Sequence, residues 1–246
     1  PAGLIANLEL LWQNLDAGAV RGNYRAPGHN ASAFAVQSFL DEIAHASRRD
    51  PLQLRLDLLG EPRTLPYSGF GGSTLDTGRL AHVLQLVAER IDWKKPRRNG
   101  HGLGIACHFT FGSYAAHAFE VSTRHGKLYF HRAICAVDVG LAVNPLGVQA
   151  QVEGATLDAL AAALLQAITI DKGQVQQHNL KHYRMARSAD LPRKVEVIVV
   201  ASSATPAGAG EVGFPSTAPA LANAVFAATT VRVRKLPLMP QLKRLL

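Results

Sequence analysis

The sequence predicts an α+β fold in which helices come first and a mixed β-sheet with packed helices follows. Apolar residues recur at helical spacing before about residue 92, whereas from residue 105 onward they alternate with a period of two. The run from Lys94 to Gly102 separates these patterns and is typical of a linker. We therefore expect a helical region over residues 1–98 and an α+β region over residues 99–246.

Three helices are expected in the first region. After the turn-forming residues 27–30, the segment 31–47 has apolar spacing near that of a helix, packed on a stripe formed by Ala31, Phe34, Ala35, Ser38, Phe39 and Ile43. Asp50 and Pro51 supply an N-cap and a first-turn proline for a second helix through Leu59. Residues 67–78 are rich in Gly and Ser and predict a loop. Asp76 or Thr77 then caps a third helix, with Leu80, Val83, Leu84, Val87 and Ile91 on one face.

The second region begins with alternating segments that predict strands. They carry Ile105, Phe109, Ala116, Ala118 and Val121, then Leu128, Phe130, Ile134 and Ala136, with His125-Gly126 as a hairpin turn between strands. An alanine-rich helix is expected over about 148–165, followed by a turn at 171–173. A short strand over 194–200 and a loop over 202–219 lead into a small-residue helix over 218–230.

Composition excludes several classes of protein. The chain has 246 residues, of which 48% are hydrophobic, so it can bury one large core or two modest ones. Its only cysteines, Cys107 and Cys135, exclude a self-contained four-cysteine iron–sulfur or zinc site. No apolar stretch reaches the roughly 20 residues that a membrane-spanning helix needs, so we expect no membrane span in this sequence. The net charge of +8 includes the basic run 94–98, which we interpret as a solvated loop or a docking face for another subunit rather than a nucleic-acid site.

Common catalytic motifs are missing or out of context. The glycines of Asn99-Gly100-His101-Gly102-Leu103-Gly104 resemble a dinucleotide-binding turn, but an alternating segment follows them where such a turn requires a helix. The sequence has no Gly-Lys-Ser/Thr step and no Gly-x-Ser-x-Gly elbow, and none of the expected helices carries a His-x-x-x-His pair. Phosphate-loop hydrolases, zinc enzymes and serine hydrolases are therefore not supported.

One carboxylate stands out in the glycine-rich segment 206–215. Glu211 is its only acid, and Val212, Phe214 and Pro215 beside it are apolar. Glycines let a backbone approach a ligand closely, and apolar surroundings suit a carboxylate that works as a general base. A solvated glutamate on a mobile loop is the alternative interpretation.

A second segment combines a strand end, a turn and a helix start. It reads Asp138-Val139-Gly140-Leu141-Ala142-Val143-Asn144-Pro145, and Gln151-Val152-Glu153-Gly154 follows. Asn144 can cap the helix with Pro145 at its first position, which is a purely structural use. The functional alternative is that Gln151 offers its amide to a buried ligand.

Taken in order with Tyr24-Arg25-Ala26-Pro27-Gly28 and the helix Gln37 to Ala44, these segments resemble the molybdopterin-binding large subunits of the xanthine dehydrogenase and aldehyde oxidase family. The likeness is strongest to isoquinoline 1-oxidoreductase and related aldehyde dehydrogenase subunits, and covers residues 22–237. Shorter matches are Asp50-Pro51-Leu52 with Arg55, Phe111-Gly112-Ser113, and Ala218-Pro219-Ala220 with Asn223-Ala224.

This resemblance implies roles for particular residues. Glu211 matches the family's active-site base beside molybdenum, on a catalytic loop over 206–217, and no residue here is expected to ligate the metal directly. The cofactor, expected in a dinucleotide form, would contact a loop over 22–30 and the residues Arg25, Ala26, Gly28, Gln151 and Gly210. Ala26 and Pro27 replace the family's usual pair, and Gln37 stands where relatives often carry Glu.

The resemblance also implies partners. The family's Gly-Gln-Gly loop and its cluster cysteines are not found in this sequence, so another chain or segment is expected to complete the site and an iron–sulfur subunit to take the electrons. The expected reaction is oxidation of an aldehyde or N-heteroaromatic carbon, a small-molecule substrate, with water as the oxygen source. The alternative is a non-catalytic assembly or interaction protein that keeps the fold without metal. The sequence indicates no cellular compartment.

Overall fold

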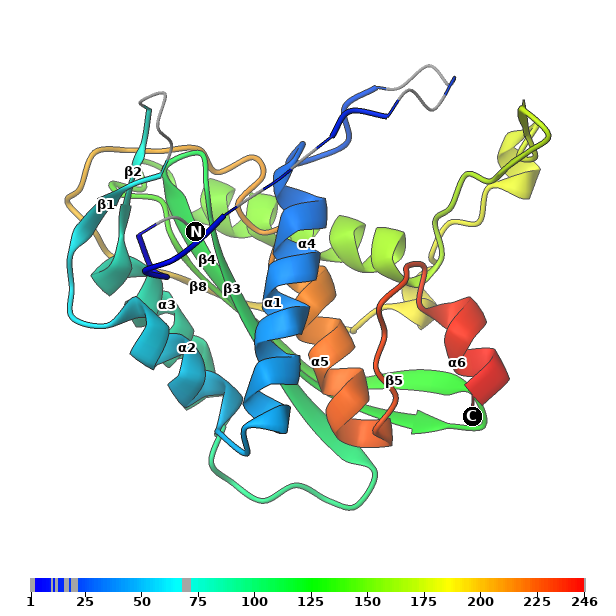
Figure 1. Cartoon of the computed structure of the whole chain (residues 1–246), viewed down its shortest axis with the longest axis horizontal. Helices are drawn as coiled ribbons and strands as arrows, with labels where there is room; N and C mark the ends of the chain where they lie inside the picture. The colour runs from blue at the N-terminus through cyan, green and yellow to red at the C-terminus, as the bar shows by residue number, and fades with distance from the viewer. Residues whose placement is uncertain are drawn as a thin grey trace.

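A four-stranded mixed sheet forms the centre of the computed structural model, which describes residues 3–9, 11, 13–15, 18, 22–67 and 72–245 (Figure 1). The strand order is β3-β4-β5-β8. Three strands are antiparallel neighbours and the fourth runs parallel to β5: β3 (His101–Thr110), β4 (Ser113–Arg124), β5 (Lys127–Asp138) and β8 (Glu196–Val199). The expected α+β class and mixed sheet are confirmed.

Helices cover both faces of this sheet, so alternate strand residues enter different cores. Ile105, Ala116 and Ile134 pack with α3 (Thr77–Arg90) on one face. Ala106, Phe119 and Ala133 pack on the other face with α4 (Pro145–Leu164) and α5 (Thr217–Thr229). The predicted period of two is therefore real, but it separates two buried faces rather than a buried and an exposed one.

The glycines near the start of β3 serve helix packing. A Cβ atom added to Gly104 would lie 2.1 Å from the Ala224 backbone nitrogen, and one added to Gly102 would lie 2.2 Å from the Ala224 carbonyl oxygen. Only glycine lets α5 lie this close to the strand. The glycine-rich segment 99–104 runs into β3, and β3 leads into another strand rather than a helix. The segment is therefore not a phosphate-binding turn.

The two cap signals of the first region are confirmed. α2 (Pro51–Leu59) begins after Asp50, whose Oδ1 accepts hydrogen bonds from the backbone N–H groups of Leu52 at 2.8 Å and Gln53 at 2.9 Å. α3 begins after Asp76, whose Oδ1 accepts from the Arg79 N–H at 3.0 Å. The predicted apolar face of α3 is buried.

The stripe predicted for α1 (His29–Ala46) is wrong for four of its six residues, since only Ser38 and the partly buried Phe34 face the core. Phe39 is 61% exposed and Ile43 is 38% exposed, while Ala31 and Ala35 are also exposed. The buried face instead carries two polar residues, Gln37 and Asp41, together with Ala33, Ser38 and Ala44. These polar side chains are buried because arginines from other segments bind them, which a pattern of apolar residues cannot reveal.

Other boundaries also differ from the expectation. The segment 67–78 is not wholly a loop, because β1 (Thr64–Pro66) pairs antiparallel with β2 (Thr74–Asp76); its residues 68–71 lie outside the described residues. α4 begins at Pro145, three residues before its expected start. Near the carboxyl end, α6 (Met239–Leu245) was not predicted.

The turns were predicted better than these short elements. His125 and Gly126 have φ angles of 50° and 66°, as a two-residue hairpin turn between twisted strands requires. Lys172 and Gly173 make a similar turn between β6 (Ile170–Asp171) and β7 (Gln174–Val175), which belong to an arm that projects from the body (Figure 1, yellow). Among the described helices, none is both long enough and apolar enough to cross a membrane.

Candidate functional site

The glycine-rich loop that carries Glu211 lies against two turns at one end of the sheet. The Ala207 N–H donates to the Val139 carbonyl at 2.9 Å, and the Gly208 N–H donates to the Phe111 carbonyl at 3.3 Å. Gly140 is obligatory here, because it has a φ of 71° and an added Cβ would lie 2.2 Å from the Thr205 carbonyl oxygen. The turn after Asp138 thus sets the path of the loop.

Three segments far apart in the sequence meet at the backbone carbonyl of Gly210. Arg25 donates to this oxygen from Nε at 2.9 Å and from Nη2 at 2.6 Å. Gln151, on the second turn of α4, donates to the same oxygen from Nε2 at 3.1 Å. The expected site residues Arg25, Gln151, Gly210 and Glu211 are therefore brought together at one point.

The segment from Tyr24 to Gly28 packs beside the residues that bind the Gly210 carbonyl. Ala26 is completely buried, has a φ of 55° and packs with Ala159 and Phe214. Gly28 has a φ of 76° and forms the N-cap of α1. Ala26 therefore packs between α4 and the glutamate loop, and Gly28 turns the chain into α1.

Asp158 is a residue that the sequence interpretation missed. It lies two turns after Gln151 on α4, and its carboxylate is 3.5 Å from Arg25 Nη1 and accepts from the Tyr24 hydroxyl at 3.0 Å. Burial, and next the neighbouring Asp158, raises the pKa of Tyr24 well above its usual range. The spacing of seven residues from Gln151 was the available signal, since it places both side chains on one face of a helix.

Glu211 itself lies at the rim of this cluster. Its side chain is partly exposed, whereas Val212 and Phe214 beside it are buried at 1% and 6% exposure. The Phe214 N–H donates to the Glu211 carbonyl at 2.9 Å and closes a tight turn. Within the described part of the chain, the Glu211 carboxylate forms no hydrogen bond or ion pair. The loop is thus anchored by its apolar residues, and the carboxylate is left available.

A hollow of about 410 Å³ lies beside Gln151. Its walls come from the turn after β5, the start of α4 and the glutamate loop, and none of its lining residues is acidic: Val139, Leu141, Ala142, Val143, Asn144, Gly147, Val148, Gln151, Ala207 and Ala209. Asn144 caps α4 by accepting from the Gly147 N–H at 3.0 Å, so the structural interpretation of Asn144 and Pro145 is confirmed.

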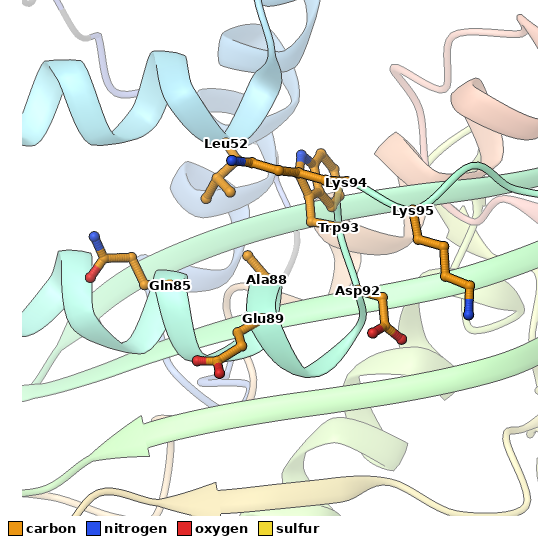
Figure 2. Close-up of a pocket in the computed structure, with 8 residues that line it drawn as sticks. All are labelled: Leu52, Gln85, Ala88, Glu89, Asp92, Trp93, Lys94 and Lys95. Atoms are coloured by element: carbon orange, nitrogen blue, oxygen red, sulfur yellow. The ribbon is translucent and has the colours of Figure 1, made fainter.

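Figure 2 shows a different hollow, formed by Gln85, Glu89 and Asp92 of α3 and its end together with Trp93 and Lys95. The Trp93 indole N–H donates to Asp50 Oδ2 at 3.0 Å, so it joins α2 to the end of α3. None of the residues in this hollow belongs to the segments around Gly210. Among the described residues, no three His, Cys, Asp or Glu side chains gather as potential metal ligands.

Comparison with known proteins shows what this chain is similar to. A family model described as the molybdopterin cofactor-binding domain matches residues 76–192. A membrane-bound aldehyde dehydrogenase (pyrroloquinoline-quinone) of Gluconacetobacter polyoxogenes is 32% identical over 219 residues, which are 85% of this chain and 28% of the relative. Isoquinoline 1-oxidoreductase subunit beta of Brevundimonas diminuta is 33% identical over 218 residues, which are 86% and 26%. The chain thus spans about a quarter of the length of these relatives.

Solved structures show the same fold at low sequence identity. Quinoline 2-oxidoreductase from Pseudomonas putida 86 matches 90% of this chain with 52% of its own, at a TM-score of 0.72 and 12% identity. Aldehyde oxidoreductase from Desulfovibrio gigas matches 91% with 41% of its own, at a TM-score of 0.68 and 13% identity. The domain match and the two curated relatives support the xanthine dehydrogenase and aldehyde oxidase family of molybdopterin-binding subunits for this chain, and the solved structures show the fold.

Proposed function

We propose that this chain is the catalytic-glutamate part of a molybdenum-cofactor-dependent oxidoreductase. The complete enzyme oxidises an aldehyde or an N-heteroaromatic carbon with water as the oxygen source, and it passes the electrons to iron–sulfur centres in a partner chain. The observation that carries the proposal is the convergence of Arg25 and Gln151 on the carbonyl of Gly210, directly before Glu211. Two polar side chains from distant segments thereby fix the backbone directly before the proposed base.

The donor set beside Glu211 fits a molybdopterin, which we propose is in a dinucleotide form. Gln151 uses Nε2 on the Gly210 carbonyl, and its Oε1 has no partner among the described residues. That oxygen can accept a hydrogen bond from an N–H group of a pterin edge. The adjoining hollow is mainly apolar and has no carboxylate, which suits a flat heterocycle.

Each of these residues has a defined part in the proposed reaction. When bound, the molybdenum cofactor supplies the two-electron oxidation of the substrate carbon. Glu211 acts as a general base, and its carboxylate accepts the proton that the reaction releases. Arg25 and Gln151 fix the backbone that precedes Glu211, and the buried Val212 and Phe214 fix the backbone that follows it.

The proposal is tested by Glu211→Gln in the intact enzyme that contains this chain. The amide keeps the shape of the side chain but cannot accept the proton, so we expect turnover to fall by about 10²- to 10⁴-fold. Molybdenum and pterin content should stay at wild-type levels, because no contact that holds the cofactor is removed. Steady-state kinetics and metal analysis measure both quantities.

Glu89→Gln is the matched control, since Glu89 is an exposed glutamate on α3 in the separate hollow. It should leave turnover unchanged. Near-full turnover of Glu211→Gln would reject the proposal. A native complex without molybdenum would instead support the alternative, a non-catalytic assembly protein of the same fold.

A further inference from the structure

His117 is completely buried where β4, α4 and the start of α5 meet. Its Nδ1 lies 2.9 Å from Ser216 Oγ, and its Nε2 lies 2.9 Å from Thr156 Oγ1 and 3.2 Å from Thr217 Oγ1. The Cys135 thiol approaches Nδ1 at 3.8 Å. One imidazole therefore links α4 to the segment that immediately follows the glutamate loop.

The hydrogen bonds of the two threonines determine which ring nitrogen carries the proton. Thr156 donates its only hydroxyl hydrogen to the Val152 carbonyl at 2.8 Å, and Thr217 donates its own to the Gly213 carbonyl at 3.0 Å. At Nε2 both hydroxyls can then only accept, so Nε2 carries the hydrogen. Nδ1 is left with a lone pair, which accepts the Ser216 hydroxyl hydrogen.

The ring stays neutral in this arrangement. Burial lowers the pKa of His117 to about 3, so the ring is uncharged throughout the neutral pH range, and the hydrogen bonds of the two threonines select its tautomer. Every polar atom of the cluster has a partner, and such a fully connected network specifies one arrangement of the segments that it joins.

The network ends on the two segments that carry the candidate site. Thr217 holds the carbonyl of Gly213, two residues after Glu211, and Thr156 lies on α4 together with Gln151. The contact between these segments is close, because a Cβ added to Gly213 would lie 3.1 Å from the Val152 carbonyl oxygen. The Gly210 carbonyl fixes the loop before Glu211, and the His117 network fixes it afterwards.

We propose that His117, through Ser216, Thr217 and Thr156, is a positioning residue that holds Glu211 at a fixed place relative to Gln151. The inference rests on the proposed function, because it assigns His117 a role through the base Glu211. Displacing a catalytic group by about 1 Å can cost about 10²-fold in rate, so loss of these hydrogen bonds should lower turnover without weakening substrate binding equally.

The test uses hydroxyl deletions in the intact enzyme. Ser216→Ala removes the donor to Nδ1, and Thr156→Val removes the oxygen that accepts from Nε2 while keeping the side-chain volume. Thr156→Ser is the conservative partner, which keeps the oxygen and loses a methyl group. Ser38→Ala is the matched control, because the Ser38 hydroxyl is also buried but has no hydrogen-bond partner in the described structure.

We expect Ser216→Ala and Thr156→Val to lower kcat by about 10- to 100-fold with KM changed by less than about threefold. Cofactor content should be unchanged, and backbone amides over residues 206–217 should exchange hydrogen faster by mass spectrometry. Thr156→Ser and Ser38→Ala should behave as the wild type. If Thr156→Ser loses as much kcat as Thr156→Val, packing rather than the hydrogen bond matters, and the inference fails.

The outcomes also separate this inference from the proposed function. Wild-type kcat in Ser216→Ala and Thr156→Val, beside an inactive Glu211→Gln, would overturn the positioning role alone. Full turnover in Glu211→Gln would overturn the assignment of the base and the positioning role with it. Unchanged hydrogen exchange over residues 206–217 in both hydroxyl variants would show that the network does not hold the loop.

Discussion

Arg55 explains why the buried face of α1 is polar. Its Nε donates to Gln37 Oε1 at 2.8 Å, its Nη2 to the Gln37 carbonyl at 2.7 Å and its Nη1 to the Pro51 carbonyl at 2.8 Å. Burial lowers the pKa of the guanidinium, which nevertheless stays charged at neutral pH. Gln37 thus provides two acceptor oxygens for a buried cation. The sequence could not predict this pairing, because it depends on how α1 and α2 pack.

Asp138, the first residue of the segment 138–145 singled out in the sequence, forms an ion pair with Arg79. Arg79 donates to its carboxylate from Nε at 2.8 Å and from Nη2 at 2.6 Å, and the Gly140 N–H donates at 3.0 Å. Burial alone would raise the pKa of Asp138, but the hydrogen bonds from Arg79 and Gly140 outweigh it, so the pKa lies below its ordinary value. The carboxylate therefore holds α3 against the turn that guides the glutamate loop.

Asp138→Asn should lower the free energy of unfolding by about 2 kcal/mol at pH 7, because it removes the charge that pairs with Arg79. A carboxylate with a lowered pKa stabilises the fold fully above its unfolded pKa of about 3.9 and loses that contribution as the pH falls. The difference from the wild type should therefore shrink below about pH 4. Urea unfolding at pH 7 and pH 3.5 measures it.

Asp171→Asn, in the exposed turn between β6 and β7, serves as the control and should change stability little at either pH. If the effect of Asp138→Asn were equal at both pH values, the ion pair would not be its cause, and the altered contact with Gly140 would be the better explanation.

At the scale of elements, local signals predicted what is locally determined. The caps Asp50, Asp76 and Asn144 mark the starts of α2, α3 and α4 because a cap binds backbone groups two or three residues away. The strands β1 and β2 have only three residues each and were missed, since their pairing joins residues about ten positions apart. The stripe of α1 was wrong because tertiary contacts, not hydropathy, chose its buried face.

The close packing of α5 on β3 predicts that a side chain added to β3 destabilises the fold. Gly104→Ala places a Cβ 2.1 Å from the Ala224 nitrogen and 2.2 Å from the Ala220 carbonyl oxygen, so strand and helix must separate. We expect a loss of more than about 3 kcal/mol in the free energy of unfolding, measured by denaturant titration.

Gly154→Ala is the matched control on α4. An added Cβ at this position meets nothing within 4 Å, and alanine favours a helix over glycine by about 1 kcal/mol. This variant should therefore be slightly more stable than the wild type. A Gly104→Ala protein of normal stability would mean that α5 does not lie on β3 as closely as described.

At the scale of the whole molecule, the candidate site depends on long-range assembly. More than a hundred residues separate Arg25 from Gln151, and about sixty separate Gln151 from Gly210. No local pattern predicts that these three residues meet. The family resemblance predicted the residues of the candidate site, whereas the shared carbonyl of Gly210, the support from Asp158 and the His117 network depend on the packing of α4 against the glutamate loop. These could be found only from the structure.

The surface around Gln151 is unusually apolar for a solvent-facing helix start. Leu141, Val143 and Leu146 are 52%, 86% and 78% exposed, and Leu141 and Val143 also line the hollow beside Gln151. Clustered apolar side chains of this kind mark surfaces that contact another protein segment or a ligand. We therefore expect the chain or segment that is proposed to complete the cofactor site to pack on this surface.

The last prediction follows from that surface. In the intact enzyme, Val143→Lys combined with Leu146→Lys should reduce the molybdopterin content and the association with the remaining parts of the enzyme, because two charges would be buried without partners. The free energy of unfolding of this chain should change by less than about 0.5 kcal/mol, since both side chains are exposed. Tyr129→Lys, at the opposite end of β5, is the control and should change neither quantity.

Expressed alone, the 246 residues should hold no stoichiometric molybdopterin and show no turnover. A chain that bound the cofactor and turned over by itself would show that the site is complete without any other segment.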